Sequence, residues 1–211
     1  MTRDQDHQSD GIAALISAIT SQRSPEYDES YGAMIDNLRD FLDALAAADI
    51  AVDDAEELSG LFAQWTPRLH EVATDDFQRP WGHVLNRAGH GQTLVLKVYD
   101  TVYEDHSFSG KTIFGRFHVG ENMAAHGGAI AVLFDDFLGW LLLKTDLPPS
   151  RTAYLKTDFK AITPIGEELE IVGRVDRIEG RKRFLSAELK QGDTVCAQAE
   201  GLWVELLPGQ G

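Results

Sequence analysis

The stretch that decides the fold is residues 126–143, HGGAIAVLFDDFLGWLLL. It is apolar on every side except for Asp135 and Asp136, and a helix of that composition is enclosed by the rest of its domain. The two glycines at its start let the backbone approach a ligand closely. We therefore expect a buried helix whose N-terminus is open to a ligand.

Two features of this helix predict a site for acyl transfer. The free N–H groups at its start, around His126, Gly127 and Gly128, suit the negative charge that develops on a carbonyl oxygen. Two turns further on, Asp135 is a carboxylate in apolar surroundings, so it needs either a partner or a catalytic purpose. The alternative is a glycine turn followed by a structural carboxylate that bonds to loop amides. Asp136 points about 100° away and is interpreted as a structural or interface residue.

Strand-like alternation precedes and follows the helix. Before it, residues 93–103 and 111–119 predict two strands joined by a polar turn at 104–110. After it, four more strands are expected over residues 152–161, 167–178, 181–190 and 194–206. Because strands and helices do not alternate, the order favours an α+β domain in which one antiparallel sheet wraps around one helix.

The front of the chain predicts a small helical module at residues 10–70. Apolar residues at helical spacing indicate a short helix near 12–19, a second beginning after the N-cap Ser24, and a third capped by Asp53 or Asp54 and ended by Pro67. Their apolar stripes predict packing against a neighbouring core, with a coiled coil as the alternative. We thus expect a helical extension over residues 1–80 and a second domain over 81–211.

Composition excludes several functional classes. The 211 residues include 34 acidic and 19 basic ones, a net charge of -15, and the excess lies in the first 80 residues. Such a surface repels phosphate backbones, so we expect no nucleic-acid partner. No run offers the roughly 20 apolar residues of a membrane span, and the start is polar and acidic, so we expect a cytoplasmic protein without membrane contact. Cys196, the single cysteine, predicts a buried strand residue.

Two further chemistries are not expected. The histidines other than His126 show no metal-ligand spacing with Cys, Asp or Glu, and HExxH is missing, so we predict neither a metal nor a cofactor. The GxSxG motif is missing as well, which argues against a hydrolase of the α/β-hydrolase type.

The segment HGGAIAVLFD, residues 126–135, resembles the HGG-containing helix of hotdog-fold acyl-CoA thioesterases of the phenylacetate-degradation, or PaaI-like, type. The resemblance continues through RTAYL (151–155), ITPIG (162–166), EGR (179–181) and GLWV (201–204). It implies a hotdog fold and hydrolysis of an acyl-CoA to a free acid and CoA. It also implies a homo-oligomer, at least a dimer, whose sites lie at the subunit interface.

The resemblance assigns a role to each site residue. Asp135 matches an aspartate that acts as general base toward water or as nucleophile, and the Gly127 N–H matches one that polarises the thioester carbonyl. His126 positions this loop, and Thr152, contributed by the partner subunit, orients the water. Related enzymes commonly place an asparagine six residues before the histidine, whereas the candidate substrate contact Asn122 lies four before it.

Several alternatives remain open at this stage. Thr152 could be an ordinary β-branched strand residue. Arg181, Lys182 and Arg183 could bind the CoA phosphates or form a solvated turn. The protein could be a non-catalytic acyl-CoA binder or an enoyl-CoA hydratase-like enzyme, because the fold alone does not prove turnover. The helical extension could shape the acyl pocket or dock onto another protein.

Overall fold

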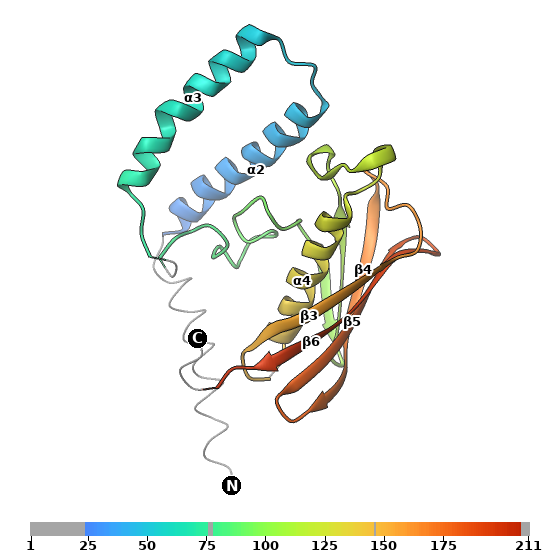
Figure 1. Ribbon diagram of the computed structural model, residues 1–211. Helices are drawn as coiled ribbons and strands as arrows, with labels where there is room; N and C mark the ends of the chain where they lie inside the picture. The colour runs from blue at the N-terminus through green and yellow to red at the C-terminus, as the bar shows by residue number, and fades with distance from the viewer. Residues whose placement is uncertain (1–23, 76–77, 146, 208–211) are drawn as a thin grey trace.

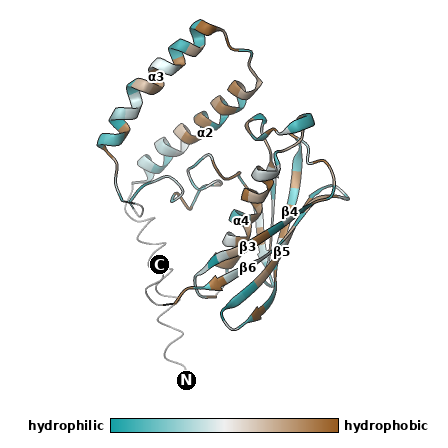
Figure 2. Cartoon of the chain, viewed as in Figure 1, coloured by the Kyte–Doolittle hydropathy of each residue, from teal (hydrophilic) through white to brown (hydrophobic). Residues whose placement is uncertain are grey.

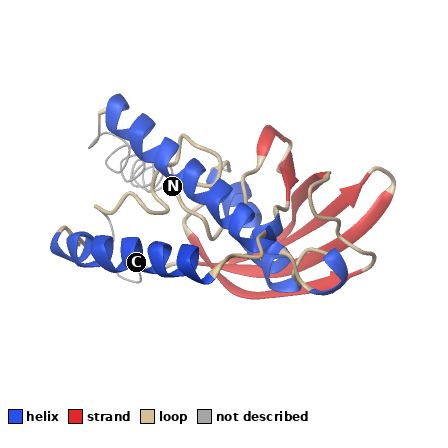
Figure 3. Ribbon diagram, turned by 90° about the horizontal axis from the view of Figure 1, so that it is seen from above, coloured by secondary structure: helices blue, strands red, loops and turns tan. Residues whose placement is uncertain are grey.

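The computed structural model describes residues 24–75, 78–145 and 147–207 (Figure 1). One antiparallel six-stranded sheet, in the order β1-β2-β4-β5-β6-β3, curves around a single helix, α4. Two longer helices, α2 and α3, extend away from the curved sheet (Figure 3). The predicted α+β architecture, with an antiparallel sheet around one helix and an N-terminal helical part, is confirmed. The short helix expected near residues 12–19 lies outside the described residues.

Helix α4, Gly127–Leu143, occupies the concave side of the sheet and contacts β3, β4, β5 and β6. Its length and apolar character match the prediction. Gly173 on β4 shows how close the packing is, because a Cβ there would lie 2.9 Å from a methyl carbon of Leu138. The buried side chains of the helix are Ile130, Leu133, Phe134, Phe137, Leu138, Leu141 and Leu142.

The four strands after α4 lie close to their predicted bounds. They are β3 (Ser150–Phe159), β4 (Glu168–Glu179), β5 (Lys182–Gln191) and β6 (Thr194–Glu205). Burial alternates along β5, as expected of a strand with one face on the core. Cys196 on β6 is fully buried, which confirms its predicted place, and this burial raises the pKa of its thiol.

The first hairpin differs from the prediction. Strand β1 is Tyr99–Glu104 and β2 is Ser107–Ile113, so the turn is two residues long and residues 93–98 are not a strand. Asp105 and His106 adopt φ angles of 46° and 62°. Two successive left-handed residues form the tight turn that suits the twist of a hairpin, although the usual Asn-Gly signal is missing here.

The helical extension begins as predicted and ends differently. In α2, Pro25–Ala47, the Ser24 Oγ accepts a hydrogen bond from Tyr27 N at 3.2 Å, which confirms this cap. Helix α3, Val52–Glu71, starts after Ala51 without a side-chain cap and runs through Pro67, so its predicted cap and end were both wrong. An exposed helix tolerates a proline because water can solvate the carbonyl group that loses its N–H partner.

The expected packing of α3 against a core is not found. Helix α3 has no buried residue, and Phe62 and Trp65 of its apolar stripe are each 53% exposed. Hydrophobic and hydrophilic segments alternate along the helix (Figure 2). Helix α2 buries only Gly32 and Ile35. The extension is therefore held mainly by α2, through contacts described below.

Candidate active site

The N-terminus of α4 presents one unengaged N–H group. His126 is the N-cap, and its Nδ1 accepts a hydrogen bond from Gly128 N at 2.9 Å. The N–H groups of Ala129 and Ile130 bond to the His126 carbonyl. Among the described residues, Gly127 N–H has no hydrogen-bond partner, so it can donate to a ligand oxygen.

Gly127 lies at a close approach between two elements. A Cβ at this position would lie 3.0 Å from Cζ of Phe159, at the end of strand β3. The loop before it is fixed by the backbone, because His126 N donates to the His118 carbonyl at 2.8 Å and Ala125 N donates to the Thr163 carbonyl at 2.9 Å. Asn122, in the same loop, is exposed and adopts a left-handed φ of 55°.

Asp135 and Thr152 meet within one chain. The Thr152 Oγ1 donates a hydrogen bond to the Asp135 Oδ1 at 2.9 Å. Two expectations are thereby corrected, because Thr152 does not need to come from a partner subunit and Asp135 is exposed in the single chain rather than buried. A β-bulge between Thr152 and Tyr154 lies next to this contact. Bulges commonly re-aim a side chain beside a site, and no feature of the sequence pattern indicated this one.

The Gly127 N–H and the Asp135 carboxylate lie far apart in one chain. They are eight residues apart on a straight helix, or about 12 Å along its axis. A water that attacks a carbonyl carbon and the donor that holds its oxygen must both lie about 3 Å from the reacting group. The two halves of the predicted site therefore cannot act on one thioester within a single subunit.

An apolar groove opens beside Asp135 and Thr152. Its volume is about 820 Å³. One wall is the second half of α4, and the other is the segment 147–149 together with the start of β3. None of its lining residues belongs to the part of the helical extension that the structure describes, residues 24–75 and 78–80. The other lining residues are Asp136, Gly139, Trp140, Leu142, Leu143, Leu147, Pro148, Pro149, Ser150, Arg151, Trp203 and Leu206.

The basic hairpin is only partly available to a ligand. Arg183 is 3% exposed and its guanidinium pairs with Glu205 at 2.6 Å, so it offers little surface to a ligand. Arg181 donates twice to the Glu205 backbone carbonyl, at 2.7 and 3.2 Å. Lys182 is exposed. Because Arg183 and Thr152 both pair with Trp203, the hairpin lies at the same end of the sheet as Asp135.

One interaction near the site was not predicted. His90 Nε2 lies 3.3 Å from Asp136 Oδ2, and the His90 ring stacks on Trp140 with centroids 4.3 Å apart. His90 has a left-handed φ of 53° and follows Gly89, so the glycine-rich loop was the only signal for it. Asp136 thus has a structural partner, as interpreted, while the neighbouring carboxylate of Asp135 faces the groove.

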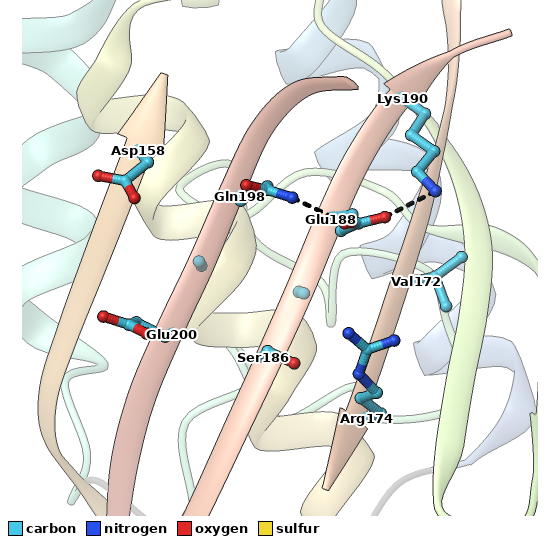
Figure 4. A pocket seen from close by; sticks show the side chains of 10 residues that line it. Asp158, Val172, Arg174, Ser186, Glu188, Lys190, Gln198 and Glu200 are labelled. Atoms are coloured by element: carbon cyan, nitrogen blue, oxygen red, sulfur yellow. Dashed lines mark hydrogen bonds and ion pairs between the residues drawn. The ribbon is translucent and has the colours of Figure 1, made fainter. Parts of the chain in front are cut away.

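A second hollow lies on the outer face of the sheet (Figure 4). Among the side chains that line it, Glu188 forms an ion pair with Lys190 at 2.6 Å and accepts a hydrogen bond from Gln198 Nε2 at 2.7 Å. Within residues 24–75, 78–145 and 147–207, no three His, Cys, Asp or Glu side chains gather as a metal site would require. The helices described over the same ranges include none with the length and apolarity to cross a bilayer.

Comparison with known sequences matches the region around the helix. Residues 123–200 match the sequence model of the thioesterase superfamily. A provisionally named esterase of Pseudomonas aeruginosa is 34% identical over 88 residues, 41% of this chain and 66% of that protein. The acyl-coenzyme A thioesterase THEM4 of Bos taurus is 35% identical over 85 residues, 39% of this chain and 34% of that protein. The chain thus spans about two thirds and one third of these two relatives.

Comparison with solved structures supports the fold of a larger part of the chain. The crystal structure of a thioesterase superfamily protein superimposes with a TM-score of 0.68 and 24% identity, covering 82% of this chain and 94% of that one. This match is longer than the stretch from residue 81 onward, so it extends into the helical extension. Together, the sequence and structure matches identify the chain as a hotdog-fold member of the thioesterase superfamily.

Proposed function

We propose that this protein hydrolyses an acyl-CoA thioester to a free acid and CoA, as a PaaI-like thioesterase. The observation that carries the proposal is the Asp135 carboxylate, which Thr152 holds at 2.9 Å beside an apolar groove of about 820 Å³. The groove suits an acyl chain, and the carboxylate and hydroxyl suit a water molecule at its mouth. The thioesterase relatives named above support the same reaction.

The reaction balances with the groups at hand. Asp135 removes a proton from water as the water oxygen attacks the thioester carbonyl carbon, and Thr152 orients the attack. The Gly127 N–H stabilises the developing oxyanion. Collapse of the tetrahedral intermediate breaks the C–S bond, and the CoA thiolate leaves and takes up a proton. Alternatively, the Asp135 carboxylate attacks the thioester carbonyl carbon directly, the C–S bond breaks with departure of the CoA thiolate, and water hydrolyses the resulting anhydride to the free acid and the restored carboxylate.

A dimer resolves the distance between the two halves of the site. Strand β3 is an edge strand, and it runs from Thr152, beside Asp135, to Phe159, beside Gly127. Antiparallel pairing of two β3 edges about a twofold axis would place the start of one strand beside the end of the other. Asp135 of one subunit would then meet Gly127 of its partner. We therefore propose at least a dimer, with two composite sites.

The first test uses purified protein and acyl-CoAs of graded chain length, with release of the free thiol as readout. Asp135→Asn should lower turnover by at least about 100-fold and leave binding of the substrate in place, which is the scale of a lost general base. Near wild-type turnover of this variant would contradict the role of Asp135. Water addition to an enoyl-CoA without thiol release would favour the hydratase-like alternative, and binding without either reaction the non-catalytic one.

The second test removes the proposed oxyanion donor. Gly127→Pro deletes the N–H at the first helical position, where proline is well tolerated, and His126 already has a ψ of 132° that suits a following proline. Turnover should fall about 100- to 1000-fold. Gly127→Ala is the matched control, because it meets Phe159 in the same way and keeps the N–H.

Subunit mixing then tests the composite site. After complete exchange between Asp135→Asn and Gly127→Pro proteins, half of the dimers would be mixed, each with one intact site. Up to about a quarter of wild-type activity should return from two inactive parents. No recovery after verified subunit exchange would show that Asp135 of one subunit does not act together with Gly127 of its partner.

A further inference from the structure

Two hydrogen bonds, one on each side of a short 3-10 helix, connect helix α2 to the loop before α4, residues 119–126. Asp43, in the last turns of α2, accepts a hydrogen bond from Phe117 N at 2.8 Å through its Oδ1. Phe117 belongs to η1, Arg116–His118, the short 3-10 helix after β2. The carbonyl of His118 in turn accepts from His126 N at 2.8 Å. The extension therefore contacts, through one short helix, the residue that caps α4.

The fit at this contact is close. Gly115 precedes η1, and a Cβ at this position would overlap the Asp43 carboxylate. Glycine therefore leaves room for the hydrogen bond between Asp43 and Phe117 N. One turn before Asp43, the Arg39 guanidinium donates to the Val95 carbonyl at 2.8 Å and to the Gln92 carbonyl. These bonds fix α2 along its axis, and Asp43 is placed directly over the backbone of η1.

None of the fully buried residues of α2 lies at this contact. The two buried residues of α2, Gly32 and Ile35, lie two to three turns away from Asp43. The His118 ring lines a small cavity together with Asp43 and Arg39, and it packs edge-on against the rings of Phe114 and Phe117. Two hydrogen bonds thus join the η1 backbone to other elements: Phe117 N donates to Asp43 of α2, and the His118 carbonyl accepts from His126 N.

We propose that Asp43 is a positioning residue, through which the helical extension holds the Gly127 N–H in line for the thioester carbonyl. This proposal rests on the proposed function. Asp43 lies outside the groove and touches no reacting atom. Without the Asp43 carboxylate, η1 loses its hydrogen bond to α2. The His118 carbonyl, which accepts from His126 N, is then held less firmly. Misplacement of a catalytic group by about 1 Å can reduce turnover by up to about 100-fold.

The test compares three substitutions in the full chain. Asp43→Ala should lower kcat by about 10- to 100-fold and leave KM nearly unchanged, since the acyl groove is intact. Asp43→Asn should restore most of kcat, because its amide oxygen can still accept from Phe117 N. Asp40→Ala is the matched control, since Asp40 lies one turn before Asp43, lines with it a small cavity between α2 and η1, and makes no hydrogen bond to η1 among the described residues. It should be indistinguishable from wild type.

Backbone hydrogen exchange in the ligand-free protein supplies a readout that does not depend on hydrolysis. Asp43→Ala should speed exchange of the amides in residues 117–128, while Asp43→Asn and Asp40→Ala should not. Faster exchange with unchanged kcat would overturn the proposal, and so would unchanged exchange. If wild type released no thiol from any acyl-CoA, the proposed function would fail, and exchange alone would then show whether Asp43 holds the loop.

Discussion

Helix α4 and the extension helices are positioned by different physical means. Seven apolar side chains of α4 are buried against the sheet, whereas α3 buries none and α2 only two residues. A buried Leu or Phe contributes about 1.5–3 kcal/mol, while an exposed ion pair contributes about 0–1 kcal/mol. The difference teaches that the Asp135 side of the site is fixed by the core, and that the extension is attached by bonds that solution conditions can weaken.

The largest expected effect compares two aromatic side chains. Phe134 on α4 is 0% exposed, and Phe134→Ala should lower the free energy of unfolding by about 3–5 kcal/mol. Trp65 on α3 is 53% exposed, and Trp65→Ala should change it by no more than about 0.5 kcal/mol. Urea unfolding followed by circular dichroism measures both. Equal losses would show that the α3 stripe is covered in solution and would remove the contrast.

The next effect compares two ion pairs. Arg183 is buried and pairs with Glu205, so Glu205→Ala should cost about 3 kcal/mol by leaving a buried charge without its partner. Asp36 pairs with Lys97 at side chains that are each 41% exposed, so Asp36→Ala should cost at most about 1 kcal/mol. The same unfolding measurement applies. A larger loss for Asp36→Ala would mean that the extension is held more firmly than its exposure indicates.

A smaller effect compares two glycines. Gly173→Ala should lower the free energy of unfolding by about 1–3 kcal/mol, because its Cβ would meet Leu138 at 2.9 Å in the core. Gly60→Ala on α3 meets nothing within 4 Å and should raise helix stability by up to about 1 kcal/mol. Thermal melts of the two variants against wild type measure the signs. A destabilising Gly60→Ala would reveal a neighbour on that face of α3.

The smallest expected effect depends on pH. Burial lowers the pKa of His118 below its usual value of about 6.5. The negative charge of Asp43 opposes this decrease in pKa, and the positive charge of Arg39 adds to it. Since the folded state favours the neutral ring, its contribution to stability is complete above about pH 6.5 and is lost as the pH falls toward the lowered pKa. Protection of residues 115–126 from hydrogen exchange should fall in that window. His118→Gln should remove this dependence, and an unchanged pH profile in that variant would assign the effect to another group.

The sequence predicted α4 and the four strands after it because their patterns are strong and their environments uniform. Period-two alternation along 182–191, for example, reflects a strand that is buried on one face. Glycines also marked the hairpin at Gly180 and the site at Gly127, since these positions need a left-handed φ and a close approach, respectively.

Other features could not be predicted because tertiary contacts decide them. The tight turn at Asp105 and His106 carries no glycine, and Pro67 stays helical because α3 is exposed. Arg183 resembled a surface charge until its place on the inner face of β5 was known. The pairing of Thr152 with Asp135 in one chain depends on a bulge, and a single extra residue leaves no periodic signal.

This bulge has a consequence for changes in chain length. Beyond it, Asp158 points away from α4 and Leu155 packs on the core. The even-numbered Thr152, before the bulge, nevertheless points toward α4. The extra residue, Ala153, therefore reverses the parity of the strand. Deleting Ala153 should leave a regular ladder in which Thr152 still faces Asp135, whereas deleting a residue elsewhere in β3 would turn one end of the strand inside out. Position 153 is thus a place in β3 where a deletion during evolution should leave the Thr152 hydroxyl beside Asp135.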